Sequence, residues 1–277
     1  TGRIDSMHEF AAQSADLKKA KLAHVLGSPI EHSLSPVIHN AAYKFLKLPY
    51  EYSALEANIE SCLEIFNKLQ HGEVFGLSLT MPLKETAFVF ADVVTENCTR
   101  SKVANTLVYR NGEFVAENTD VYGISQVLKQ QVNLLDEPWT VFGTGATARS
   151  AISALHDLGI SDVNVIGRNE LKLHELELDF GVKTTHLGAK VPVKNLISTL
   201  PAAAQSEFGY LIANVSYLFD VNYGSWPTML ADKLVNSDAV IVNGLPLLVN
   251  QAQMQIEIMT GQQVPIEVLF AAVAHLG

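Results

Sequence analysis

The segment PWTVFGTGATARSAISALHDLG, residues 138–159, decides the fold expected for this chain. It contains a short apolar strand, a glycine-rich turn and an alanine-rich helix, with G-x-G-x-x-A at Gly143, Gly145 and Ala148. In such a turn the first glycine permits the tight bend, the second lets a pyrophosphate approach the backbone, and the small third residue allows close helix packing. The helix N-terminus adds amide donors and a positive dipole. A Rossmann-type dinucleotide site is predicted; a tight turn without a ligand is the alternative.

The next strand, DVNVIGR at 162–168, indicates which dinucleotide fits. An NAD site usually carries an acid at this strand's end to bind the ribose 2′-hydroxyl. Here no acid stands at the strand's end; Arg168 occupies that place and Lys172 comes one turn later. A guanidinium binds a 2′-phosphate through two oriented hydrogen bonds. The sequence therefore favours NADP over NAD. A solvated arginine, partly neutralised by Glu170, is the plainer alternative.

Further strands and helices surround this unit. Strand candidates follow at 195–201, 211–223 and 238–244, and a long helix at 247–261 is closed by Gly261 as its C-cap. Before it, strands at 21–27, 50–55 and 74–82 alternate with helices at 36–48, 59–70 and 84–94, whereas residues 1–18 are polar, helix-like and peripheral. This alternation is typical of a parallel α/β layer. We expect one domain at 20–120, completed by 245–277, and a nucleotide-binding domain at 121–244.

Composition limits the class of protein. The 277 residues are 48% hydrophobic and 17% charged, which suits two globular domains. A net charge of −10 argues against a general nucleic-acid or anionic-membrane surface. Two cysteines, Cys62 and Cys98, are too few for a disulfide framework, so we expect a location in the reducing cytoplasm. No apolar run approaches the roughly 20 residues of a membrane span, and the segment TGRIDSMHEF lacks a signal-peptide pattern.

Three polar motifs lie outside the nucleotide unit. LTMPLKE places Lys84 just after a strand, VANTLVYR places Asn105 in an apolar setting, and ENTDVYG places Asp120 at an expected helix start. Taken singly, each also fits a plainer role: a surface lysine, a turn residue and a helix N-cap.

Together the motifs resemble one family. HSLSP, T-x-P-x-K, ANTL, NTDxxG, the glycine-rich turn and G-x-x-x-L-V-x-Q occur in the order seen in shikimate dehydrogenases, and the resemblance spans residues 21–277. It implies an N-terminal α/β substrate domain, a Rossmann NADP domain, and C-terminal helices that return to the first domain. The implied reaction is the reversible NADPH-dependent reduction of 3-dehydroshikimate to shikimate. The family is found as monomers and homodimers, and the sequence does not choose between them.

The resemblance also implies roles for single residues. The catalytic pair would be Lys84 and Asp120, the substrate ligands Ser33, Ser35, Thr80, Asn105, Tyr223 and Gln251, and the cofactor-binding residues Gly143, Gly145, Ala146, Arg168, Lys172, Thr199 and Gly244. Lysine can donate a proton to a carbonyl oxygen during reduction and recover it during oxidation. No metal is required, because the nicotinamide carries the hydride.

The segment SPIEHSLSPVIHN, residues 28–40, would hold the substrate carboxylate. Ser33 and Ser35 are two residues apart, so on an extended segment their hydroxyls share a face. His32 and His39 could touch a ligand, but structural or surface roles are favoured.

Departures from the family pattern leave alternatives open. Thr147, Gly167 and Leu247 differ from residues common in the family, which affects cofactor affinity and the nicotinamide wall more than the reaction. The nearest alternative is a quinate/shikimate enzyme that uses NAD; Ser35 and Arg168 favour shikimate with NADP. A non-catalytic paralogue would not need the lysine–aspartate pair, and a folate-type dehydrogenase would not explain HSLSP.

Overall fold

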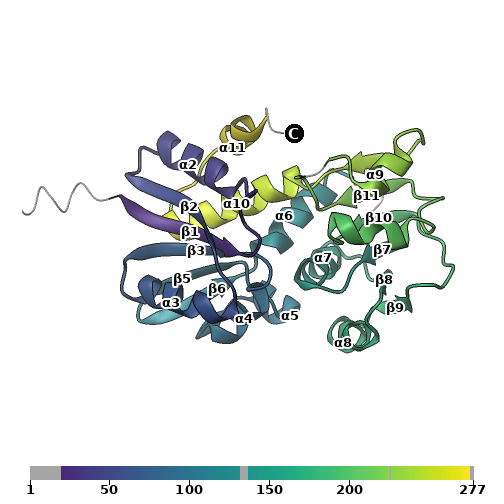
Figure 1. Ribbon diagram of the computed structural model, residues 1–277, viewed down its shortest axis with the longest axis horizontal. Helices are drawn as coiled ribbons and strands as arrows, with labels where there is room; N and C mark the ends of the chain where they lie inside the picture. Colours follow the sequence, from purple (N-terminus) through teal and green to yellow (C-terminus); the bar gives the residue numbers. More distant parts are fainter. Residues whose placement is uncertain (1–19, 132–136, 225, 275–277) are drawn as a thin grey trace, which may run out of the picture.

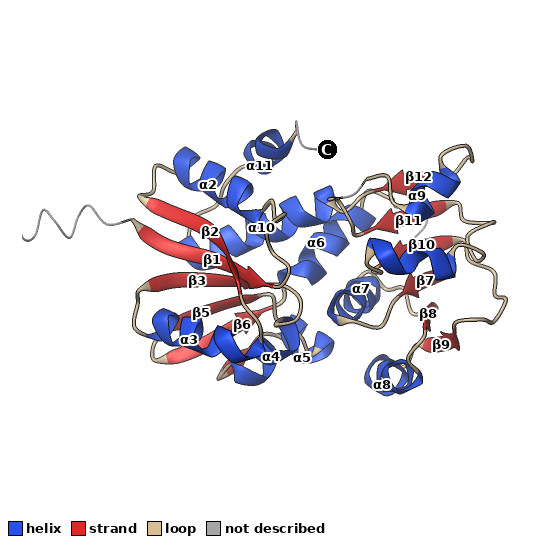
Figure 2. Ribbon diagram, viewed as in Figure 1, coloured by secondary structure: helices blue, strands red, loops and turns tan. Residues whose placement is uncertain are grey.

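The computed structural model describes residues 20–131, 137–224 and 226–274, and these form two sheets surrounded by helices (Figures 1 and 2). Within the described residues, the first sheet has the strand order β2-β1-β3-β5-β6-β4 and the second has the order β12-β11-β10-β7-β8-β9. The helix-like segment expected at 1–18 lies outside the described residues. The predicted α/β class with two sheet-based units is confirmed.

The first sheet is mixed rather than wholly parallel. β1 pairs in parallel with β2 and β3, as predicted, but β5 runs antiparallel to both β3 and β6. The strands are β1 (Lys21–Gly27), β2 (Tyr50–Glu56), β3 (Val74–Leu79), β4 (Val93–Val94), β5 (Thr106–Arg110) and β6 (Glu113–Glu117), and the helices are α2 (Ser35–Phe45), α3 (Ile59–Gln70), α4 (Lys84–Phe90) and α5 (Glu96–Ser101).

Two boundaries in this sheet were predicted wrongly. The helix expected over 84–94 ends at Phe90, and Val93–Val94 pair with β6 instead. The strand expected over 74–82 ends at Leu79, because the amide of Leu83 turns back to the Thr80 carbonyl.

The β5–β6 hairpin was missed although the sequence carries its signal. Asn111 and Gly112 join the two strands with φ angles of 55° and 88°. Two consecutive left-handed residues make the type I′ turn that Asn-Gly favours, since its twist matches that of the flanking strands. This hairpin brings Asn105 and Glu117 to one end of the sheet.

The second sheet is parallel throughout, which confirms the predicted Rossmann-type unit. Its strands are β7 (Trp139–Phe142), β8 (Val163–Gly167), β9 (Lys183–His186), β10 (Asn195–Ser198), β11 (Tyr217–Asp220) and β12 (Val240–Val242), and its helices are α7 (Ala146–Asp157), α8 (Glu170–Phe180), η2 (Ala202–Phe208, a 3₁₀ helix) and α9 (Met229–Leu234). The strand expected over 211–223 shortens to β11, because Leu211 and Ile212 pack into the core from a turn.

Three helices remain: α6 (Thr119–Leu128) and α10 (Leu245–Thr260) lie where the chain passes between the two units, and α11 (Ile266–Val273) follows α10. α10 packs against α6 and α2, and α11 packs against α2 (Figure 1). Val249 and Ile256 share one hydrophobic cluster with Ala23 and Ile38, so the C-terminal helices return to the first sheet as expected. Gly261 ends α10 with φ 72°, which confirms the predicted C-cap.

One buried imidazole lies within that packing. His39 on α2 is fully buried, its ring stacks on Tyr52 with centroids 3.9 Å apart, and its Nε2 lies 3.3 Å from Oε1 of Gln255. Burial lowers the pKa of His39 to about 3. The ring is therefore a neutral structural group, which confirms the interpretation favoured from sequence.

We expect His39 to make the fold sensitive to acid. The unfolded histidine takes up a proton near its ordinary pKa of 6.5, whereas the buried ring does so only near 3, so stability falls as the pH drops below about 6.5. When the pH is lowered from 7 to 5, the unfolding free energy of the parent chain should fall by up to about 2 kcal/mol more than that of His39→Gln. Urea unfolding at both pH values measures this difference. The exposed His71→Gln variant is the control. Equal pH dependence in His39→Gln and the parent chain would contradict this role.

Candidate active site

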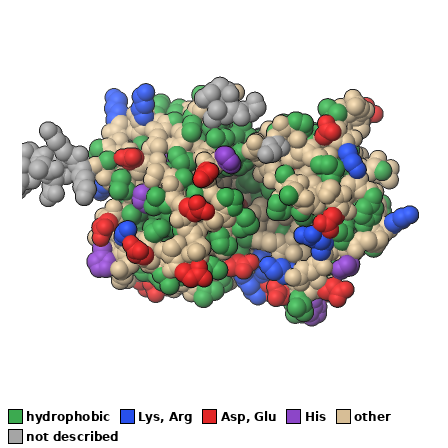
Figure 3. Space-filling view, viewed as in Figure 1, with side chains coloured by type: hydrophobic (Ala, Val, Ile, Leu, Met, Phe, Trp, Pro, Cys, Tyr) green, Lys and Arg blue, Asp and Glu red, His purple; other side chains and the backbone are tan. Residues whose placement is uncertain are grey.

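A cavity of about 380 Å³ lies between the two sheets, where β1 and β3 end. The surface is visibly hollowed between the two halves of the molecule (Figure 3). The cavity is lined by residues from distant parts of the sequence that were predicted as site residues. These are Ser33, Ser35, Thr80, Lys84, Asn105, Asp120, Tyr223, Gly244 and Gln251. Carboxyl ends of parallel strands are where ligands bind in open α/β sheets.

An ion pair marks one wall of this cavity. Lys84 begins α4, Asp120 lies in the first turn of α6, and Lys84 Nζ donates to Asp120 Oδ2 at 2.5 Å. The side chains are only 12% and 9% exposed, so water screens their attraction less than it screens a surface pair. The interpretation of Asp120 as a helix N-cap is wrong, because Asn118 holds that position.

Asn105 fixes the other oxygen of this carboxylate. Its Nδ2 donates to Asp120 Oδ1 at 2.8 Å, while its own Oδ1 accepts from the backbone amide of Thr119 at 2.8 Å. The backbone amide can only donate, so it sets which way the Asn105 amide faces. Asn105 Nδ2 also lies 3.4 Å from Oε1 of Gln251 on α10. The aspartate is thus held between a lysine and an asparagine.

A second polar layer lies beneath, and sequence reasoning missed it. Gln255 is 1% exposed, and its Nε2 donates to the Asn105 carbonyl at 3.1 Å and to Thr106 Oγ1 at 3.0 Å. Its Oε1 accepts from Ser78 Oγ at 2.8 Å. Gln255 and Ser78 both line the cavity. The spacing of Gln251 and Gln255, four residues apart on one helix face, was the available signal.

Ser33 and Ser35 line the cavity, but the backbone between them does not have the extended conformation that was expected. The segment is not extended at this point: Leu34 has helical dihedrals, Ser35 starts α2, and Pro36 occupies its first turn. The Ser35 amide donates to Ser33 Oγ at 3.3 Å. Ser35 is buried and Ser33 is half-buried, so a carboxylate here would meet two hydroxyls and the N-terminus of an eleven-residue helix.

Tyr223 closes this end of the cavity. Burial raises the pKa of Tyr223, and hydrogen bonds with the Leu34 backbone and the Ser33 side chain oppose that rise. The phenol therefore stays protonated at neutral pH and lies within hydrogen-bonding reach of the serine loop.

A second cavity of about 580 Å³ adjoins the first and contains the expected cofactor residues. Thr80, Lys84 and Thr147 line both cavities. The second cavity is also lined by Gly143, Gly145, Ala146, Arg168, Lys172 and Thr199. Gly244, which was grouped with the cofactor residues, lies instead on the wall of the first cavity.

The glycine-rich turn has the geometry that its sequence predicts. Gly143 has φ +106°, and a Cβ atom there would meet Thr199 Oγ1 at 2.5 Å. Gly145 is the N-cap of the twelve-residue α7, and a Cβ built on it meets no atom within 4 Å. The backbone at Gly145 thus faces open space at a helix N-terminus, which fits a pyrophosphate.

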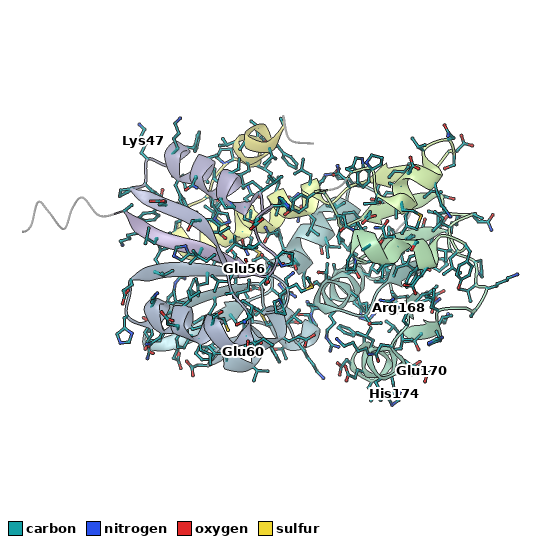
Figure 4. The ribbon with its side chains drawn as sticks, viewed as in Figure 1. Lys47, Glu56, Glu60, Arg168, Glu170 and His174 are labelled. Carbon is teal, nitrogen blue, oxygen red and sulfur yellow. The ribbon has the colours of Figure 1, made fainter. Side chains whose placement is uncertain are left out.

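Arg168 follows β8 at the edge of the second cavity (Figure 4). Its Nη1 lies 2.7 Å from Oε1 of Glu207 on η2. The acid expected to neutralise part of the Arg168 charge was Glu170, but the structure places Glu207 there instead. The order of strands in the sheet brings the end of β8 close to η2, the helix that follows β10. Lys172 lies in the first turn of α8, capped by Asn169.

Gly244 is required by close backbone packing. A Cβ atom at this position would lie 1.9 Å from the carbonyl oxygen of Val221. The residue is the N-cap of α10, so this contact sets where Gln251 stands relative to the second sheet.

Other features bear on the kind of site. Among the described residues, no group of three or more His, Cys, Asp and Glu side chains is placed to hold a metal ion. No helix in the described ranges is long and apolar enough to cross a membrane. Cys62 and Cys98 are both buried free thiols, and burial raises the pKa of Cys98 to about 12.

Known proteins match this chain along most of its length. Residues 25–107 match the family described as the shikimate dehydrogenase substrate binding domain. A Prochlorococcus marinus (strain MIT 9215) protein named shikimate dehydrogenase (NADP(+)) is 30% identical over 91% of this chain and 96% of its own length. The crystal structure of Mycobacterium tuberculosis shikimate dehydrogenase has a TM-score of 0.80 at 33% identity, covering 93% of this chain and 100% of that chain. A Thermus thermophilus shikimate 5-dehydrogenase in complex with NADP(H) and shikimate has a TM-score of 0.81 at 25% identity, covering 92% and 99%.

The contact at Gly244 yields a test of the cavity wall. Gly244→Ala forces Cβ against the Val221 carbonyl, so the backbone must shift, and we expect a loss of roughly 1–3 kcal/mol in unfolding free energy. Gly224→Ala is a matched control, because Gly224 lines the same cavity and its Cβ meets no atom within 4 Å. Denaturant unfolding of both variants gives the comparison. Equal stability of the two variants would show that the Val221 contact does not restrict position 244.

Proposed function

This chain belongs to the shikimate dehydrogenase family, and from that membership we propose that it catalyses the reversible NADPH-dependent reduction of 3-dehydroshikimate to shikimate. It is an NADP-dependent oxidoreductase of the aromatic biosynthesis pathway. The substrate is a small molecule; neither a nucleic acid nor a membrane is proposed as a partner.

The observation that carries this function is the position of the Lys84–Asp120 pair. Lys84 lies on the wall common to two cavities, one rich in hydroxyl and amide groups and the other built on the glycine-rich turn. A substrate in the first cavity and a nicotinamide entering from the second would meet beside this lysine. A protein that only binds a ligand has no need for a proton donor there.

In the proposed mechanism, the cavity built on the glycine-rich turn would hold NADPH, which would supply the hydride for the carbonyl carbon. Lys84 donates a proton from Nζ to the carbonyl oxygen as the alcohol forms, and in the oxidative direction it accepts the proton of the same hydroxyl. Asp120 holds the ammonium group in place through the 2.5 Å contact. Asn105 keeps that carboxylate oriented by binding its second oxygen.

The remaining substrate residues are proposed to orient the ring. Ser33 and Ser35, with the α2 N-terminus, would bind the carboxylate, and Tyr223 would close that end of the cavity. Thr80, Asn105 and Gln251 line the wall where ring hydroxyls would lie. Quinate carries one more hydroxyl at the carboxylate-bearing carbon. Serine rather than threonine at position 35 supports shikimate as the preferred substrate.

The cofactor residues fit NADP. The open backbone at Gly145 and the α7 N-terminus would hold the pyrophosphate, and Ala146 and Thr199 line the same cavity. Arg168 and Lys172 are proposed to bind the 2′-phosphate, since no acid follows β8 at this position. Gly244 is proposed to approach the nicotinamide from the α10 side.

We also propose how the chain divides and where it acts. Residues 20–120 with 245–277 would form the substrate domain, and 121–244 the NADP domain, supported by the two separate sheets. A cytoplasmic location is supported by the free thiols of Cys62 and Cys98. Both a monomer and a homodimer are compatible with the site.

The function is tested by a spectrophotometric assay that crosses shikimate and quinate with NADP and NAD. We expect the highest kcat/KM for shikimate with NADP, because Ser35 favours that ring acid and Arg168 that cofactor. Absence of turnover in all four combinations would instead indicate a non-catalytic paralogue. Preference for quinate with NAD would assign the nearer alternative.

Replacing Lys84 tests the assigned proton donor. Lys84→Ala should fold and bind shikimate but lose at least about 100-fold in kcat, the low end for a general acid–base group. The exposed Lys47→Ala variant is the control (Figure 4). Near-normal turnover of Lys84→Ala would remove this lysine from the mechanism.

A further inference from the structure

The ion pair between Arg168 and Glu207 stands at the edge of the proposed cofactor cavity. Glu207 lies on η2, the 3₁₀ helix after β10, and its neighbours Ala204 and Phe208 line that cavity. The Arg168 and Glu207 side chains are 57% and 47% exposed, and their charged groups are 2.7 Å apart. The guanidinium expected to receive a phosphate is therefore already engaged by a carboxylate of the same chain.

The chemistry of the two cofactors differs at this point. NADP presents a phosphate, which must displace Glu207 from Arg168 or share the guanidinium with it, and the two anions repel each other. NAD presents only a 2′-hydroxyl, which can donate a hydrogen bond to a carboxylate. Glu207 thus weakens the binding of NADP and does not weaken the binding of NAD.

We propose that Glu207 is a cofactor-specificity residue that competes with the 2′-phosphate for Arg168 and so narrows the preference for NADP over NAD. This inference rests on the proposed function, because it takes the second cavity as the dinucleotide site. It differs from that function in assigning a role to a side chain of η2, far from the glycine-rich turn in sequence.

The test is the binding of NADP and NAD to the full-length Glu207→Gln variant, measured by calorimetry or cofactor fluorescence. Glutamine keeps the shape of the side chain and removes its charge. The Kd for NADP should fall about 1.5- to fivefold, as expected for release of a surface ion-pair partner, while the Kd for NAD should stay unchanged or rise. The change for NADP should shrink as salt is added, since added ions screen both the pair and the phosphate.

Two variants separate this role from a general charge effect. Glu170→Gln removes an acid that lies close in sequence to Arg168 but is not its partner, and it should leave the ratio of the two Kd values unchanged. In the Arg168→Ala background, Glu207→Gln should give a smaller gain for NADP than in the parent chain, because the competition requires the guanidinium and only the direct repulsion between the two anions is left.

The outcomes are distinguishable. If the parent chain binds NADP and Glu207→Gln leaves the ratio of the NADP and NAD dissociation constants unchanged, the inference is overturned and the proposed function stands. An equal gain in the Arg168→Ala background also overturns it. If the parent chain binds neither cofactor, the proposed function fails and takes the inference with it.

Discussion

The rest of the site depends on the hydrogen bonds made by the side-chain amide of Asn105. Its oxygen accepts from the Thr119 backbone at the start of α6, and its nitrogen donates to Asp120 and lies near Gln251 on α10. One buried amide therefore joins the end of the first sheet, the helix that leads into the second unit, and the helix that returns from it. Any of these buried polar groups would carry a desolvation penalty if it lost its partner. The hydrogen bonds around Asn105 therefore form together.

These hydrogen bonds also position the Lys84–Asp120 pair on the wall between the two cavities. Asp120 is fixed in orientation, and it in turn holds Lys84 on the wall where the cavities meet. Beneath it, Gln255 binds the Asn105 backbone and connects it to Ser78 and His39. Because burial keeps His39 uncharged at neutral pH, this layer stabilises the site without adding a charge beside the lysine. The charges on this wall of the cavity thus stay with the Lys84–Asp120 pair.

Much of the fold was readable from local patterns. The helix at 59–70, the strand at 21–27 and the glycine-rich turn appear where spacing and glycine chemistry predict them. The β5–β6 hairpin also has a local signal, the Asn111-Gly112 pair of its turn. The strand expected at 211–223 was too long, since an apolar run does not reveal whether it packs as a strand or as a turn.

The sequence by itself determined the two α/β units, the order of the motifs, and the residue types for hydride and proton transfer, because these depend on short-range spacing and on the chemistry of single side chains. Only the tertiary structure decided which groups meet. Glu207 rather than Glu170 pairs with Arg168, Ser35 lies at a helix start, and Gln255 binds the Asn105 backbone from 150 residues away. Each of these contacts joins segments brought together by sheet order and helix packing, which local sequence does not encode.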